Sequence, residues 1–104
     1  MTTYFVTRHP GAVEWAARRG LVATMVDHLD VGRIAAGDVV MGTLPIQLAA
    51  EVCARGARYL HLEMTLPPDS RGIPLSADDM DRLGAPLVEY RAHRVEGTPM
   101  ENVK

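Results

Sequence analysis

Two short segments of this 104-residue chain combine side chains that can bind a phosphodiester and act on it. The first is Thr7-Arg8-His9-Pro10-Gly11, and the second is Gly42-Thr43-Leu44-Pro45. Hydroxyl and guanidinium groups donate hydrogen bonds to phosphate oxygens, and an imidazole transfers protons near neutral pH. Each segment contains a proline where a helix is expected to start, and a helix N-terminus offers unpaired N–H groups to an anion. These residue types therefore indicate binding or cleavage of a phosphodiester.

Each of these residues also has an ordinary structural explanation. A threonine in front of a helix is commonly an N-cap, a single arginine is commonly a solvated charge, and a histidine before a proline is more often structural than catalytic. The occurrence of two similar turns favours a functional site. The candidate catalytic residues are Arg8 and His9. The candidate substrate-binding residues are Thr7, Pro10, Gly11, Gly42, Thr43, Leu44, Pro45 and Gln47.

The other three histidines rank lower as functional residues. His28 lies between two aspartates at the end of a predicted strand, and His93 belongs to a basic stretch that we expect to be exposed. His61 is expected to line either a pocket or a dimer interface. No two histidines or carboxylates have the spacing of a zinc site, and no glycine-rich Walker loop is present. We therefore expect neither a metal nor a cofactor.

Both segments are expected to follow strands of a small α/β sheet. Hydrophobic patterning predicts strands at residues 3–8, 23–28, 39–41, 59–66 and 87–95, and helices from Pro10 to Arg18-Arg19-Gly20, at 46–54 and from Ser76 to about Leu83. Two strand–turn–helix units predict a Rossmann-like, mostly parallel sheet flanked by helices, in a single domain over residues 1–95 with a flexible tail at 96–104. Such sheets bind ligands beyond the carboxyl ends of their parallel strands, where both segments fall.

The strand predicted at 59–66 alternates cleanly between two faces. One face is apolar and is expected in the core; it consists of Leu60, Leu62, Met64 and Leu66. The opposite face consists of Tyr59, His61, Glu63 and Thr65. The pattern leaves open whether this second face is solvated, faces a ligand or pairs with a partner chain.

The composition restricts the partners of the chain. It has 47% hydrophobic and 23% charged residues and a formal net charge of −2, which argues against broad capture of long nucleic acid. The single cysteine, Cys53, is expected to fill the core and suits a reducing cytoplasm. No apolar run approaches the ~20 residues of a membrane span, and no signal-peptide pattern is seen. We expect a cytoplasmic protein without membrane contact, and a homodimer would suit so small a domain.

Four stretches of the chain resemble a small Csx-type family of CRISPR-associated proteins found with type III systems. They are YFVTRHPGAVEWA at 4–16, GTLP at 42–45, LAAEVCARGARYLHLE at 48–63 and LSADDM at 75–80. The resemblance extends over most of the chain, from Tyr4 to about Tyr90. It implies a Rossmann-like fold related to the sensor domains for cyclic oligoadenylate, and a homodimer acting on cyclic tetra-adenylate.

The resemblance implies a ring nuclease, which opens this cyclic messenger and switches off the antiviral response. Such an enzyme is expected to work without metal, by attack of a ribose 2′-hydroxyl on the adjacent phosphorus, leaving a 2′,3′-cyclic phosphate. In that reaction we assign phosphate clamping to Arg8, orientation of the ligand to Thr7 and Thr43, and proton transfer to His9. Two alternatives stay open: a non-catalytic protein that binds or sequesters the messenger, and a structural partner of a larger CRISPR complex.

Overall fold

The computed structural model describes residues 1–63 and 76–95 of the chain. Its elements within these ranges are, in order, β1 (Thr3–Val6), α1 (Pro10–Arg18), β2 (Thr24–Val26), the 3-10 helix η1 (Val31–Arg33), β3 (Val39–Gly42), α2 (Ile46–Ala54), β4 (Arg58–Leu62), α3 (Ala77–Leu83) and β5 (Leu87–Tyr90). The strands form one sheet in the order β2-β1-β3-β4-β5, in which β5 alone is antiparallel to its neighbour. The predicted small, mostly parallel α/β sheet is confirmed.

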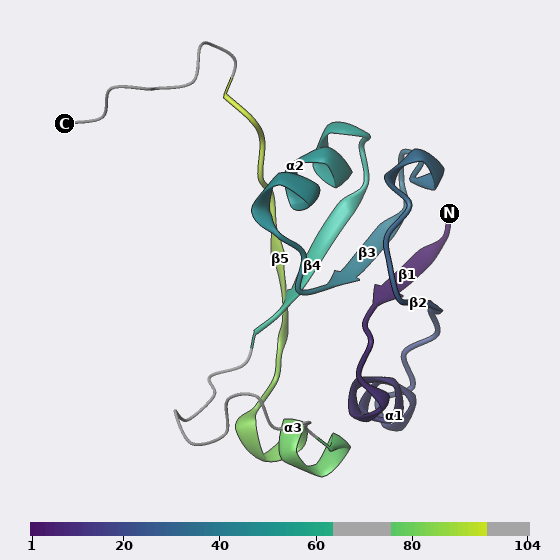
Figure 1. Cartoon of the computed structure of the whole chain (residues 1–104), viewed down its shortest axis with the longest axis vertical. Coiled ribbons are helices and arrows are strands. Elements are labelled where there is room, and N and C mark those ends of the chain that lie inside the picture. Colours follow the sequence, from purple (N-terminus) through teal and green to yellow (C-terminus); the bar gives the residue numbers. More distant parts are fainter. Residues whose placement is uncertain (64–75, 96–104) are drawn as a thin grey trace, which may run out of the picture.

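Helices cover both faces of this sheet. Figure 1 shows α1 and α3 at one end of the view and α2 at the other, with the strands between them. The side chains of β3 alternate between the two layers: Val39 and Met41 share a core with Trp15 of α1 and Met80 of α3, whereas Val40 packs in a second core with α2. A parallel strand between two helical layers is buried on both faces, which explains the continuous apolar run of β3.

Three strands are shorter than the sequence predicts. β1 ends at Val6 instead of residue 8, because the Thr7 hydroxyl accepts a hydrogen bond from the His9 N–H (3.1 Å) and turns the chain toward α1. β2 spans Thr24–Val26 instead of 23–28, since it is an edge strand that pairs only with the short β1. β5 ends at Tyr90 instead of residue 95. It runs antiparallel to β4, its last residue pairs with Tyr59, and the residues after it soon pass the beginning of β4.

β4 spans Arg58–Leu62, so it begins one residue before the prediction, and Glu63 follows the strand instead of belonging to it. The other boundaries follow the predictions closely. β3 extends one residue further than expected, to Gly42, and α2 spans the predicted residues 46–54 with Pro45 as its N-cap. α3 begins with the predicted capping box, in which Ser76 and Asp79 exchange hydrogen bonds between side chain and backbone. The predicted strand residues 64–66, the loop at 67–75 and the tail at 96–104 lie outside the described residues.

One face of β4 agrees with its prediction and the other does not. Leu62 is buried and Leu60 packs against the core formed with α1 and α3. Tyr59, assigned by the sequence to an open or ligand-facing side, is 3% exposed and belongs to the core beneath α2. The correction has a simple cause: α2 covers this face of the sheet, so the phenol ring is packed while its hydroxyl finds polar partners.

A buried carboxylate joins the amino ends of β1 and β3. Asp38 is 5% exposed, and its two oxygens accept hydrogen bonds from the N–H of Ala35 (2.9 Å) and of Thr2 (2.8 Å). These two bonds hold the pKa of the Asp38 carboxyl below its ordinary value, because they stabilise the charged form. Asp38 thereby fixes the beginning of β3 beside the beginning of β1.

We predict that Asp38→Asn lowers the melting temperature at neutral pH, because one amide oxygen replaces two carboxylate oxygens that each accept an N–H. The lowered pKa makes this stabilisation complete above the unfolded carboxyl's pKa of about 3.9, and it is lost as the pH falls through the lower folded value. Circular dichroism should therefore show that the difference in melting temperature between variant and wild type becomes smaller below about pH 4. A difference in melting temperature that stays the same at every pH would contradict this role of Asp38. Asp27→Asn, at an exposed aspartate, is the control.

Candidate functional site

The two segments singled out in the sequence lie at neighbouring strand ends. β1 and β3 are adjacent and parallel, and the helices that follow them cover opposite faces of the sheet. In such sheets the ligand binds beyond the carboxyl ends of the two strands at which the connections diverge, the switch point. Residues 7–11 follow β1 and residues 42–45 include the end of β3, so both flank the switch point.

The two strands approach each other closely at Gly42. Val6, Gly42 and His61 are register partners in one row across β1, β3 and β4. Gly42 has a φ of +148°, and a Cβ at this position would lie 2.7 Å from the Val6 carbonyl oxygen. Only glycine adopts this backbone conformation without strain and leaves room for the neighbouring carbonyl. Gly42 is buried, and the packing of the strands accounts for it.

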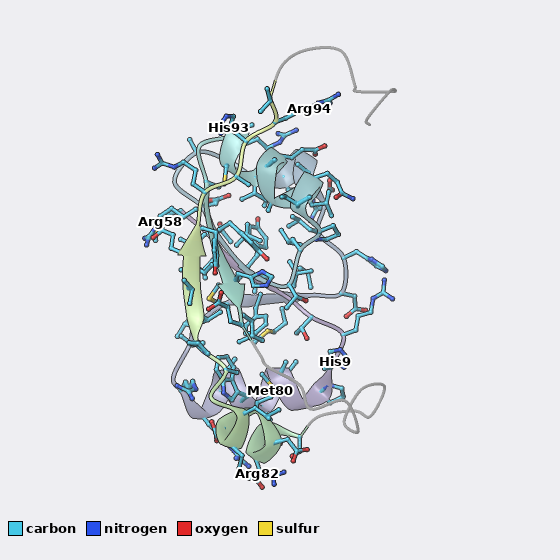
Figure 2. All side chains as sticks on the ribbon, turned by 90° about the vertical axis from the view of Figure 1, so that its left-hand side faces the viewer. His9, Arg58, Met80, Arg82, His93 and Arg94 are labelled. Carbon is cyan, nitrogen blue, oxygen red and sulfur yellow. The ribbon has the colours of Figure 1, made fainter. Side chains whose placement is uncertain are left out.

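The first segment presents Arg8 and His9 to solvent. Thr7 still extends the sheet, since its N–H donates to the Val26 carbonyl at 2.9 Å. His9 is the N-cap of α1, and its carbonyl accepts the Ala12 N–H. Figure 2 shows His9 at the margin of the molecule, beside the first turn of α1. Among the described residues, none makes a hydrogen bond to the His9 imidazole.

The guanidinium of Arg8 lies against an imidazole from the next strand. Its Nη2 is 3.0 Å from Nε2 and 3.1 Å from Nδ1 of His28, which follows β2. Within residues 1–63 and 76–95, five other arginines form ion pairs with carboxylates and Arg8 forms none; the five are Arg18, Arg19, Arg33, Arg58 and Arg82. The charge of Arg8 is therefore not neutralised by an ion pair in this part of the structure and is available to an anion.

The second segment is anchored at one point and otherwise open. The Leu44 N–H donates to the Tyr59 hydroxyl (2.8 Å), which ties the turn to β4. Thr43, Pro45 and Gln47 are exposed around it. The side chain of Ile46, the first residue of α2, is 77% exposed. The predicted binding residues of this segment are thus accessible, except for the buried Gly42 and the partly buried Leu44.

The helices differ in how their N-termini are satisfied. α3 has a complete capping box and two acidic residues in its first turn. α1 and α2 have neither a side-chain cap nor an acidic residue in the first turn. An uncapped N-terminus retains free N–H donors and the positive end of the helix dipole, which favour an anion. The two open N-termini are those next to the switch point.

A network of aromatic and polar side chains lies beside the second segment. The Tyr59 hydroxyl is 3.1 Å from the Gly42 carbonyl oxygen and 2.6 Å from Nδ1 of His61. The His61 ring makes edge contacts with Tyr59 (5.7 Å between centroids) and with Tyr90 (5.9 Å). The Tyr90 hydroxyl in turn donates to Glu63. Burial raises the pKa of Tyr59, and the hydrogen bond to Glu63 raises that of Tyr90, so both remain protonated donors at neutral pH.

From sequence alone, His28 ranks low as a functional residue and the role of His61 is open. His28 is exposed, as expected of a strand end, but it also contacts Arg8. A signal for both residues existed in the strand order: β2 and β4 are parallel to β1 and β3, so their carboxyl ends meet at the same edge. Polar residues at four strand ends, rather than two, thus form this edge.

A hollow of about 140 Å³ lies beside β2 and is lined in part by His28, the contact of Arg8. Its other lining residues are Tyr4, Thr24, Val26, Leu29, Asp30 and Arg33. In the described ranges, no three side chains of histidine, cysteine, aspartate or glutamate form a group that could hold a metal ion. No helix in the part of the chain that the structure describes is long and apolar enough to span a membrane.

Comparison with known families identifies one match. Residues 4–93 match the model of the family described as "Putative CRISPR-associated protein (Cas_VVA1548)". No curated protein and no solved structure matches the chain. The family match covers both segments of the candidate site and the strand that carries His61.

We predict that Gly42→Ala destabilises the fold by about 2–4 kcal/mol, since it adds a clash with the Val6 carbonyl to a strained φ. Gly20→Ala is the matched control. Gly20 also has a positive φ (+68°), but a Cβ there meets no atom within 4 Å, so strain alone should cost about 1 kcal/mol. Urea unfolding of the two variants measures the difference. Equal losses would show that the approach of β1 and β3 does not require the glycine.

Proposed function

Because the chain belongs to this family of CRISPR-associated proteins, we propose that it is a ring nuclease of type III CRISPR systems. Its substrate is a cyclic oligoadenylate, with cyclic tetra-adenylate as the expected ring, and its cleavage in the cytoplasm ends the antiviral signal. The observation that carries the proposal is the pair of uncapped helix N-termini at the switch point, beside an arginine without a carboxylate partner among the described residues.

This arrangement suits a phosphodiester. In the first turns, the Gly11 N–H of α1 and the Ile46 and Gln47 N–H groups of α2 have no partner among the described residues. These donors and the positive ends of the two helices face an anion from two sides, and Arg8 adds a cation. The hydroxyls of Thr7 and Thr43 lie in the same two segments. The contact of Arg8 with His28 holds the guanidinium at this edge without neutralising it. A phosphate that binds here replaces the imidazole as the partner of Arg8.

The proposed reaction is a transphosphorylation within the substrate. The ribose O2′ bonds to the adjacent phosphorus, the bond from phosphorus to O5′ breaks, and the products carry a 2′,3′-cyclic phosphate and a 5′-hydroxyl. Holding O2′, phosphorus and O5′ in line lowers the barrier; because the attacking hydroxyl already belongs to the substrate, the gain is one of orientation alone. Arg8 and the helix N-termini stabilise the charge on the phosphorane oxygens, and His9 is the candidate for proton transfer.

A homodimer completes the proposal. A twofold axis presents two copies of the Arg8 and His9 loop to one cyclic ligand, so that a ring of four nucleotides meets two equivalent sites. The formal net charge of −2 does not favour the binding of long nucleic acid. The small cyclic ligand requires only the local positive potential at the strand ends.

A second candidate function is binding without cleavage. It is favoured by one observation: no hydrogen bond orients the His9 imidazole within the described residues, whereas the donors that would bind phosphate are in place. Under this second hypothesis, the protein sequesters or senses the cyclic messenger.

We expect the wild-type protein to open cyclic tetra-adenylate in buffer that contains EDTA. Liquid chromatography with mass spectrometry should identify linear products that end in a 2′,3′-cyclic phosphate. An intact ring that remains tightly bound would contradict the nuclease and support sequestration. Neither binding nor cleavage would contradict both and indicate a structural partner of a CRISPR complex. Cleavage that requires added Mg²⁺ would contradict the metal-independent reaction.

We expect Arg8→Ala to weaken ligand binding and to slow single-turnover cleavage, each by about tenfold to a hundredfold, since a charge-assisted hydrogen bond to phosphate is lost. Arg55→Ala is the matched control, because it removes the same charge from the C-cap of α2, at the opposite edge of the sheet. Binding is measured by calorimetry and cleavage with enzyme in excess. Equal effects of the two substitutions would remove Arg8 from the site.

A further inference from the structure

We propose that His61 is the catalytic residue that accepts the proton of the ribose 2′-hydroxyl, and that Tyr59 is the residue that positions it. This inference rests on the proposed ring nuclease function. It assigns the base step to His61 because the His61 ring has a hydrogen-bond partner, whereas the His9 ring has none among the described residues. His9 then serves as the proton donor to O5′.

The location of His61 places it at the switch-point edge. It is the register partner of Gly42, which is in turn the partner of Val6, so it lies in the last paired row of the three parallel strands. Its side chain is on the same face as Tyr59, two residues earlier in β4, which is the face that α2 covers. Through the Tyr59 hydroxyl, it is linked to Leu44 in the turn that leads into the open N-terminus of α2.

Two tyrosines fix the orientation of the His61 ring. Nδ1 lies 2.6 Å from the Tyr59 hydroxyl, and the ring is held by edge contacts between Tyr59 and Tyr90. Among the described residues, the titratable groups that contact the imidazole are these two tyrosines, and Glu63 accepts a hydrogen bond from Tyr90. His61 is only half-buried, so its other nitrogen, Nε2, is the atom left for a ligand.

The Tyr59 hydroxyl can support either neutral form of this imidazole. It accepts the Leu44 N–H and has one proton to donate, with two acceptors in reach: the Gly42 carbonyl oxygen at 3.1 Å and Nδ1 of His61 at 2.6 Å. When the proton goes to Gly42, Nδ1–H donates to the hydroxyl and Nε2 is an unprotonated base. When it goes to Nδ1, Nε2 carries the proton. Rotation of one hydroxyl thus follows the protonation of Nε2.

The step balances without a further reactant. Nε2 takes the proton from the 2′-hydroxyl as O2′ bonds to phosphorus and the bond to O5′ breaks. O5′ receives a proton from His9, in its charged form, and leaves as a hydroxyl. The imidazolium of His61 and the neutral His9 return to their starting forms by exchange of one proton with water. Tyr59 keeps Nδ1 in place throughout.

The test uses His61→Asn in the full-length protein with cyclic tetra-adenylate. Asparagine places a polar atom where Nδ1 lies, so it retains a partner for Tyr59, but it has nothing at the position of Nε2. We expect a single-turnover rate lower by about 100-fold or more, with little change in ligand affinity. The decline of the wild-type rate on the acidic side, where a base becomes protonated, should be lost. His9→Ala should instead remove the decline on the alkaline side.

Two further variants complete the design. Tyr59→Phe keeps the His61 imidazole but removes the hydroxyl that contacts it. Cleavage should become about tenfold slower, because the imidazole is no longer held in position. His93→Gln changes an exposed imidazole that Figure 2 shows at the opposite end of the molecule from His9, and should leave the rate unchanged. Thermal unfolding confirms that each variant is folded.

The outcomes separate this inference from its premise. A wild-type protein that leaves the ring intact overturns both. A wild-type protein that cleaves, with His61→Asn equally fast, overturns the role of His61 and leaves the nuclease standing. A His61→Asn variant that is slow but still loses rate at acidic pH also overturns the role of His61, because another residue would then be the base.

Discussion

The close parallel pairing of β1 with β3 is the constraint on which the rest of the structure depends. Asp38 joins the two strands at their amino ends, and Gly42 allows them to meet at their carboxyl ends, where no side chain would fit beside the Val6 carbonyl. The helices that follow these strands then pack on opposite faces of the sheet. This divergence places two loops and two helix N-termini around one point, so the stability of the central pair and the location of the site have one cause.

The same structure separates elements that stabilise from elements that remain open to a ligand. α3 is closed by its own capping box and packs on α1 through buried Met80 and Trp15. The ion pairs of Arg18 and Arg19 with α3 are exposed, and solvent screening leaves them little effect on stability. α1 and α2 keep uncapped N-termini, although a side-chain cap would add stability of about 1 kcal/mol per helix. The two N-termini that lack a cap are those at which a bound anion would supply the missing hydrogen-bond acceptors.

Much of the fold could be predicted from the sequence, and so could the location of both candidate segments at the carboxyl ends of strands. The helices at Pro10 and at 46–54 and the capping box of Ser76 followed from local patterns, because each depends on residues close in sequence. The mostly parallel sheet followed from the order of strands and helices, since a helix between two strands favours a parallel crossover. The burial of Tyr59 could not, since it depends on α2 covering a face whose pattern looked open. The contact of Arg8 with His28 joins residues 20 apart in sequence through the pairing of β1 with β2, which no local pattern encodes.

Tyr59 connects the two properties that a ring nuclease would need, a placed phosphate and a placed proton acceptor. A phenylalanine would fill the core beneath α2 equally well, so the hydroxyl must be explained by its partners. It holds the Leu44 N–H, and hence the turn before α2, and it also contacts Nδ1 of His61. In the proposed site, the same oxygen atom would link an anion at the N-terminus of α2 to the imidazole, because the turn and Nδ1 share the Tyr59 hydroxyl as their partner.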